Sequence, residues 1–97
     1  MSKTSDVLSK EKFYVYILFS SKDSKFYTGF TTNLKTRLSE HRLGNVPSTK
    51  IRRPFKLIHY EYFINKKDAK MREVFLKSGF GRNQIKQALK RTLAEFK

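Results

Sequence analysis

The stretch FYVYILFSSKDSKFYTGFT, residues 13–31, contains two aromatic segments joined by a short polar turn. Residues 13–20 are rich in aromatic and β-branched side chains and are apolar on both alternating faces, which is typical of a central strand covered on both sides. Residues 26–31 have the composition of a second strand, and the serine, lysine and aspartate residues before them favour a turn. The stretch therefore predicts an antiparallel hairpin.

Alternation along these two strands predicts which side chains lie together. Tyr14 and Tyr16 share one face of the first strand, and Tyr27 and Gly29 share one face of the second. A glycine at this position serves as a strand bend, and its missing side chain would also let a phosphate backbone approach closely. Gly29 is therefore one of the residues that we expect at a nucleic-acid contact.

A helix is predicted directly after the hairpin. Asn33 and the threonines before it are N-cap candidates, and the helix runs to about Leu43 and stops at Gly44. At 100° per residue, Arg37 and His41 border the apolar stripe of this helix. We therefore expect both side chains at the edge of the core, where they can meet a ligand.

The segment FKLIHYEYF, residues 55–63, predicts a third strand. One expected face consists of Phe55, Leu57, His59 and Glu61, and the other of Lys56, Ile58, Tyr60 and Tyr62. Two further helices follow, one beginning near Asn65 and one running to about Phe96 after the break SGFG. The order β-β-α-β-α-α predicts an α+β fold, a small three-stranded antiparallel sheet flanked by helices.

The helix that begins near Asn65 has two candidate inward faces. Its expected apolar sector consists of Met71, Val74 and Phe75, and its other side of Ala69, Arg72, Glu73 and Leu76. We therefore expect this helix to be covered on both sides. By contrast, GNVPSTKIRRP, residues 44–54, predicts an exposed, mobile loop whose Lys50, Arg52 and Arg53 would contact a nucleic-acid backbone.

The charge of the chain points to a polyanionic partner. Its 97 residues suit a single domain, expected over residues 13–97 after a flexible arm of residues 1–12. Lysine and arginine number 22 against 8 acidic residues, a formal net charge of +14, and nucleic acid is the expected partner. Without cysteine, disulfides and thiolate zinc sites are excluded, and any metal would be held mainly by oxygen ligands. The lack of an apolar leader favours a cytoplasmic location.

The motif YVY at residues 14–16, the eleven-residue step from Tyr16 to Tyr27, the motif YTG, and then Arg37 and His41 resemble the GIY-YIG nuclease domain. The sequence departs from the family motifs at strand positions. It has YVY where the family has Gly-Ile-Tyr, and YTG where the family has Tyr-Ile-Gly. Both keep the functional tyrosine. The resemblance extends over most of the chain and is closest to the small stand-alone bacterial members of that family.

The resemblance implies metal-assisted hydrolysis of DNA phosphodiesters. One of the paired tyrosines would be the general base, Tyr27 in preference to Tyr16, and the other would position the water or phosphate. A phenol that acts as a base needs nearby cations that favour the phenolate. Arg37 would clamp the scissile phosphate, and His41 would relay a proton or hydrogen-bond a tyrosine or phosphate. Glu73 would hold a single Mg²⁺ or Mn²⁺ ion.

The resemblance also implies partners and a process. DNA repair or recombination is a candidate process for this chain, and branched or flexible DNA is a candidate substrate. Substrate choice would then come from DNA shape, a partner protein or a homo-oligomer. Two other hypotheses stay open: a catalytically silent DNA- or RNA-binding module on the same fold, and an RNA-binding or ribosome-associated protein. The aromatic residues are expected to be buried rather than displayed for stacking, which counts against RNA.

Overall fold

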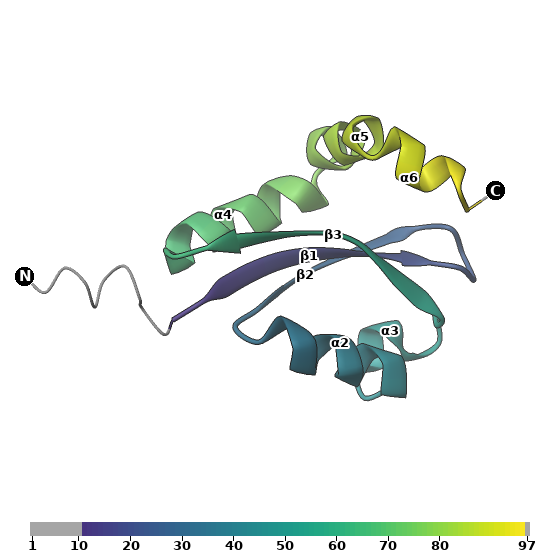
Figure 1. Ribbon diagram of the computed structural model, residues 1–97, viewed down its shortest axis with the longest axis horizontal. Helices are drawn as coiled ribbons and strands as arrows, with labels where there is room; N and C mark the ends of the chain where they lie inside the picture. Colours follow the sequence, from purple (N-terminus) through teal and green to yellow (C-terminus); the bar gives the residue numbers. More distant parts are fainter. Residues whose placement is uncertain (1–10, 97) are drawn as a thin grey trace, which may run out of the picture.

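The computed structural model describes residues 11–96 and has helices on both sides of one sheet (Figure 1). In chain order the elements are β1 (Phe13–Ser20), β2 (Phe26–Thr31), α2 (Leu34–Leu43), α3 (Pro47–Lys50), β3 (Phe55–Phe63), α4 (Lys66–Lys77), α5 (Gly79–Ala88) and α6 (Lys90–Ala94). This is the predicted α+β class, with α3 and α6 added to the expected order. The expected N-terminal arm lies almost wholly outside the described residues. None of the helices described is long and apolar enough to cross a membrane.

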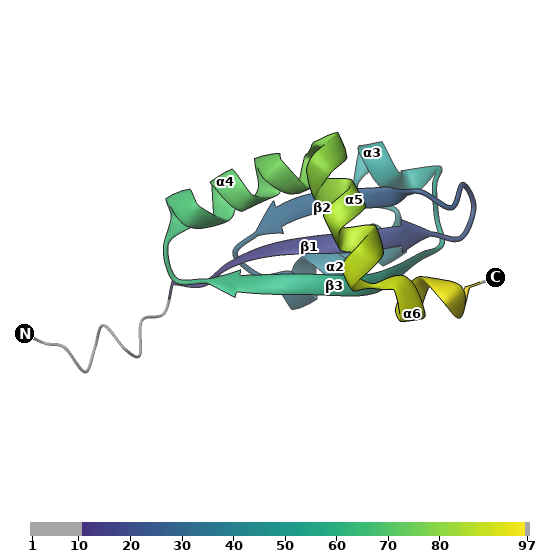
Figure 2. The same cartoon turned by 90° about the horizontal axis from the view of Figure 1, so that it is seen from above.

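The predicted hairpin is present, and its first strand is central. The sheet order is β2-β1-β3 with antiparallel pairing throughout, as Figure 2 shows from above. Tyr16 lies opposite Gly29 on β2 and opposite Tyr60 on β3. Residues directly opposite one another project to the same face of a sheet, so this register fixes which side chains can meet.

The core lies between the sheet and the helices α4 and α5. It consists of Phe13, Val15, Ile17, Ala69, Leu76 and Ile85. The other face of β1 is turned toward α2. Because Tyr62 pairs with Tyr14, Tyr60 with Tyr16, and Tyr27 with Leu18, all five tyrosines of the chain lie on that second face. The sheet therefore has a hydrocarbon face and a phenolic face.

A bulge in β3 corrects the predicted alternation of that strand. Ile17 pairs with His59 and Leu18 pairs with Leu57, so Ile58 is an extra residue between them. The extra residue reverses the alternation. Leu57 and Tyr60 therefore share the α2 face, and the expected grouping of Leu57 with His59 is wrong.

The inward face of α4 is the one that carries Ala69 and Leu76, which are 0% and 1% exposed. Met71 and Val74 are 73% and 70% exposed, so the helix is covered on one side only, contrary to expectation. Small Ala69 lets the helix approach β1 closely. The polar side chains of the same inward sector are thereby carried toward the sheet, which matters for Glu73.

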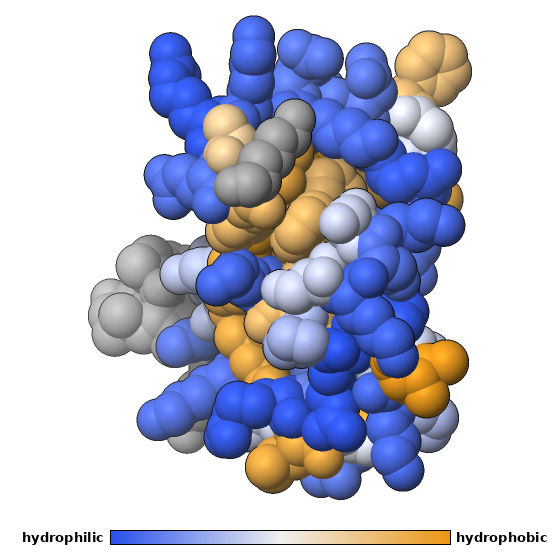
Figure 3. Space-filling view, turned by 90° about the vertical axis from the view of Figure 1, so that its right-hand side faces the viewer, coloured by the Kyte–Doolittle hydropathy of each residue, from blue (hydrophilic) through white to orange (hydrophobic). Residues whose placement is uncertain are grey.

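The segment 44–54 is a compact connection rather than a mobile loop. Gly44 ends α2 with a left-handed φ of 80°, α3 follows, and Val46 and Thr49 are 4% and 0% exposed. On the side of the molecule that contains the β1–β2 turn, hydrophilic side chains surround smaller apolar areas (Figure 3). The excess of basic residues is therefore displayed on the surface, with the apolar residues set between them.

The junction of α4 and α5 depends on Gly81. A Cβ atom built there would lie 2.0 Å from the Phe75 carbonyl oxygen, whereas one built at Gly79 meets nothing within 4 Å. We expect Gly81→Ala to lower the free energy of unfolding by about 1–3 kcal/mol. Gly79→Ala, the matched control, should leave it unchanged or raise it by up to about 1 kcal/mol. Urea unfolding followed by circular dichroism measures both, and equal effects would contradict the packing argument.

Candidate active site

Tyr16 reaches across the sheet, and Gly29 makes room for it. A Cβ atom on Gly29 would lie 2.4 Å from the Tyr16 hydroxyl oxygen and 2.5 Å from its Cζ atom. The ring of Tyr16 therefore lies over the neighbouring strand, where any other residue would collide with it. In this structure the space left by the glycine side chain is filled by the tyrosine.

The hydroxyl of Tyr16 is the first member of a buried chain of hydrogen bonds. It lies 2.7 Å from Nε2 of His41, and Nδ1 of His41 lies 2.8 Å from Oγ1 of Thr49. Oγ1 of Thr49 donates to the Val46 carbonyl at 3.3 Å, so it accepts from the imidazole. His41 therefore carries its proton on Nδ1, and Nε2 accepts the proton of Tyr16. The chain links β1, α2 and α3.

Burial keeps both rings of this chain neutral at neutral pH. Tyr16 and His41 are 0% and 2% exposed. Burial lowers the pKa of His41 from 6.5, and the charge of Arg37 lowers it further. Burial raises the pKa of Tyr16 to about 12, with Arg37 opposing the shift and the charges of Tyr27 and Glu73 adding to it. Tyr16 therefore keeps its proton and acts as a donor.

Tyr27 is the accessible tyrosine of the cluster. Its ring centroid lies 5.2 Å from that of His41 and 6.4 Å from that of Tyr16. Its side chain is partly exposed, and its hydroxyl makes no hydrogen bond to any of residues 11–96. This phenol is therefore held in place by ring contacts while its oxygen stays available to a water molecule or a phosphate.

Arg37 brings a positive charge to the same cluster. It projects from α2, its side chain is 35% exposed, and Nη1 donates to Oε1 of Glu40 at 2.9 Å. Bonding to Glu40, and then to Tyr16, raises the pKa of Arg37. Helix α2 is held in register by its caps, with the Asn33 side chain accepting from the Thr36 amide. The guanidinium therefore stays charged beside the tyrosines.

Glu73 approaches from the other side of the sheet. It lies on α4, which packs over β1 and β2, and its side chain is only 13% exposed. Its carboxylate pairs with Lys70 at 3.6 Å and Lys77 at 2.9 Å, and its charge acts on Tyr16. Within residues 11–96 no three acidic or histidine side chains cluster as metal ligands. A lone carboxylate suits Mg²⁺, which keeps several waters and adds substrate phosphate oxygens, and the two half-exposed lysines are free to swing aside.

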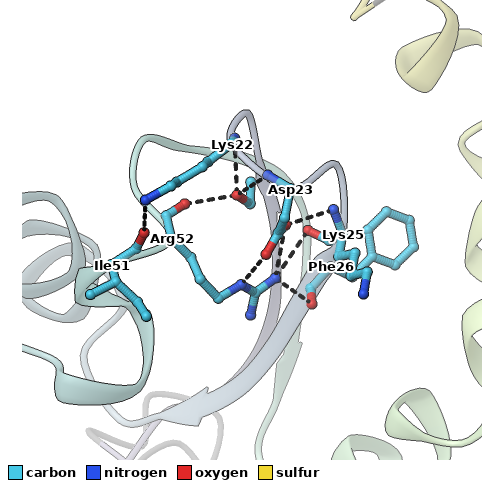
Figure 4. Close-up of polar contacts among 7 residues, drawn as sticks. Lys22, Asp23, Lys25, Phe26, Ile51 and Arg52 are labelled. Carbon is cyan, nitrogen blue, oxygen red and sulfur yellow. Dashed lines mark hydrogen bonds and ion pairs between the residues drawn. The ribbon is translucent and has the colours of Figure 1, made fainter.

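The basic side chains after α3 have different surroundings. Arg52 pairs with Asp23 at 2.7 Å and donates to backbone carbonyls at the β1–β2 turn, and Lys22 donates to the Ile51 carbonyl (Figure 4). This contact with Arg52 lowers the pKa of Asp23 to about 2. Arg53 donates to the carbonyls of Lys50 and Arg42. Lys50, the last residue of α3, makes no ion pair among the residues described, so its charge is uncommitted.

Sequence reasoning missed three residues at this face, Thr49, Tyr60 and Tyr62. Thr49 gave no signal because a threonine in a polar loop has no periodic neighbour, and its role as the partner of His41 depends on a turn that brings the two together. Tyr60 and Tyr62 were expected to be buried, yet they are 51% and 48% exposed. The signal was present in the alternation of β3, but the bulge at Ile58 reversed it.

Comparison with known proteins gives matches over most of the chain. The GIY-YIG catalytic domain matches residues 12–86. A UPF0213 protein of Clostridium perfringens is 43% identical over 77 residues, 78% of this chain and 81% of its own length. A UPF0213 protein of Staphylococcus haemolyticus is 43% identical over 74 residues, 75% of this chain and 88% of its own length.

One solved structure is similar in both sequence and fold. The solution NMR structure of a UPF0213 protein from Bacillus halodurans is 34% identical, with a TM-score of 0.52, and the match covers 79% of this chain and 84% of that one. Residues 12–86, which match the GIY-YIG catalytic domain, contain both tyrosine motifs, Arg37, His41 and Glu73. The chain therefore belongs to the GIY-YIG family of nuclease domains.

Proposed function

We propose that this chain is a metal-dependent DNA endonuclease that acts at Tyr27, Arg37 and Glu73, with Tyr16 and His41 as positioning residues. The observation that carries the proposal is the contact of Tyr16, Tyr27 and His41, three rings from two strands and a helix, next to a guanidinium. A structural role alone would not need a partly exposed phenol without a hydrogen-bond partner. The net charge of +14 supplies the attraction for DNA.

In the proposed reaction, the phenolate form of Tyr27 takes a proton from the water that attacks phosphorus, and solvent supplies the proton that the departing oxygen gains. The new bond joins the water oxygen to phosphorus, and the bond to the 3′ oxygen breaks, which leaves a 5′-phosphate and a 3′-hydroxyl once that oxygen is protonated. Arg37 binds the phosphate and neutralises the charge that grows on its oxygens. These roles fit the accessible hydroxyl of Tyr27 and the half-exposed guanidinium of Arg37.

Tyr16, His41 and Thr49 hold this arrangement rather than touch the substrate. Their bonds of 2.7 Å and 2.8 Å fix the imidazole, whose ring supports Tyr27. Glu73 would hold the divalent ion, Mg²⁺ or Mn²⁺. When bound, such an ion stabilises charge on the phosphate and on the departing oxygen.

The proposed nuclease activity is tested by incubating the protein with labelled duplex, flap, branched and single-stranded DNAs in the presence of Mg²⁺ or EDTA and measuring the cleaved DNA. We expect the wild type to cut at least one of them only with metal, and Tyr27→Phe to lower the rate by about 10²–10⁴-fold. Glu73→Gln should abolish metal-dependent cutting. Glu95→Gln, at the C-cap of α6, is the matched control and should cut normally. Binding without cutting by the wild type, whatever the metal, would instead support the silent binding module.

Gly29→Ala tests the space that Tyr16 needs. Its new methyl group would meet the Tyr16 hydroxyl, so we expect this ring to leave His41 and the unfolding free energy to fall by about 1–3 kcal/mol. Cutting should fall as well, because His41 loses its support. Tyr16→Phe, which removes only the hydroxyl, is the comparison. Normal stability and normal cutting by Gly29→Ala would show that the close approach has no consequence.

The buried imidazole predicts a pH dependence of stability. The pKa of His41 is lowered from 6.5 in the folded chain, so below that pH the unfolded state binds a proton that the folded state does not. Stability is therefore fully present above 6.5 and is lost as the pH falls toward the folded value. Urea unfolding between about pH 5.5 and 8 should show this slope in the wild type and a smaller one in His41→Gln. Equal slopes in the two proteins would contradict a neutral His41.

A further inference from the structure

Helix α2 divides the phenolic face of the sheet into two sides. Arg37 projects on the side of β2, whereas Lys35 and Arg42 project on the side of β3, because the inward stripe of the helix separates them. On the β3 side a groove of about 910 Å³ is lined by Leu18, Lys22, Lys35, Leu38, Ser39, His41, Arg42, Lys50, Ile51, Arg53, Pro54, Phe55 and Leu57. His41, whose ring also supports Tyr27, is one of the residues that line this groove.

A second hollow continues the groove along the same flank of α2. It has a volume of about 500 Å³, shares Lys35 and Leu38 with the first, and is bordered by Tyr14 and Tyr60. The ring of Tyr14 lies 6.1 Å from that of Tyr60 and 5.6 Å from that of Tyr62. Tyr60, which lines this hollow, is 51% exposed, and Tyr62, which follows it on the same face of the paired strand β3, is 48% exposed. The channel thus has a rigid aromatic wall.

The charges of the channel are all of one sign. No aspartate or glutamate lines either hollow. Lys22 and Arg53 are bonded to backbone carbonyls, but Lys35, Arg42 and Lys50 make no ion pair with any of residues 11–96. Uncommitted cations beside exposed aromatic rings fit a ligand with regular negative charges and flat apolar groups.

We propose that this channel between α2 and β3 binds an unpaired segment of DNA, whose bases stack on Tyr60 and Tyr62 and whose phosphates meet Lys35, Arg42 and Lys50. In a duplex the base faces are covered by their neighbours, so only an unpaired strand can use the tyrosines. The first hollow is lined by His41, whose ring centroid lies 5.2 Å from that of Tyr27, so a strand bound in the channel would lie near the proposed site. Resting on the proposed function, this names the substrate class as DNA with a single-stranded segment beside the cut.

Binding is measured without metal, so that it does not depend on cutting. A dye-labelled fifteen-nucleotide oligothymidylate is titrated in EDTA with the wild type, Tyr60→Ala, Tyr60→Phe and Phe80→Ala. We expect Tyr60→Ala to bind about ten-fold more weakly, about 1.4 kcal/mol, because a stacked base is lost. Tyr60→Phe should bind within about two-fold of the wild type because it keeps the ring. Phe80, 86% exposed on α5, is the control for loss of an exposed ring elsewhere.

An abasic strand of the same length separates stacking from charge. It keeps the phosphates, so we expect weak binding that Tyr60→Ala does not change, whereas Lys35→Ala should reduce the salt dependence of both strands. Wild-type affinity of Tyr60→Ala for oligothymidylate, or an equal loss on the abasic strand, would overturn the proposal. Tighter binding of oligouridylate by more than about ten-fold would overturn its assignment to DNA.

The outcomes separate this proposal from the nuclease. If the expected binding pattern is found and no DNA is cut with Mg²⁺, the proposed binding of unpaired DNA in the channel is supported and the proposed nuclease activity is rejected. If DNA is cut but Tyr60→Ala binds oligothymidylate as the wild type does, the nuclease stands and the channel fails. Circular dichroism of each variant establishes that it is folded, and the exposure of Tyr60 makes that the expected result.

Discussion

The hydrogen bond between the Tyr16 hydroxyl and Nε2 of His41 is the interaction on which the phenolic face depends. It joins the central strand to α2 in a place closed to water, where an unpaired hydroxyl or imidazole would be costly. The bond forms only because Gly29 leaves room for the ring. Thr49 then fixes the other nitrogen and so binds α3 into the same unit. One bond thereby sets the positions of the strand pair, the helix and the turn after it.

The two faces of the sheet have different roles: one forms the hydrophobic core and the other carries the candidate site. Phenylalanines and aliphatic residues on one face pack against α4 and α5, and the tyrosines on the other face leave several oxygens and ring faces available. Glu73 is the exception, because it belongs to the core-side helix and acts on Tyr16 from there. Its low exposure follows from the close approach of α4 at Ala69, so core packing also decides where the acidic charge lies.

Local patterns predicted the hairpin, the bounds of α2 and its caps, because each is decided by neighbours in sequence. The residues of the family motif came instead from the resemblance to the GIY-YIG domain, which depends on their order and spacing along the chain. The sequence of α4 did not show which face of the helix turns inward, because two of its sectors contain apolar residues. In the structure the face with the small Ala69 packs against the sheet. Thr49 was out of reach for another reason: its partner His41 lies eight residues away and meets it only after the chain has turned at Gly44.

The extra residue in β3 also limits how this strand can vary. Side chains along it can be exchanged one at a time, but a deletion or insertion that cancelled the bulge would turn every residue after Leu57 to the opposite face. His59 and Glu61, which bond to each other on the core side, where Glu61 also pairs with Arg72, would then replace the tyrosines, and the tyrosines would enter the hydrocarbon core. The length of β3 is thus under a stricter constraint than its composition, and a relative that lost one residue here would keep the fold while losing the aromatic wall.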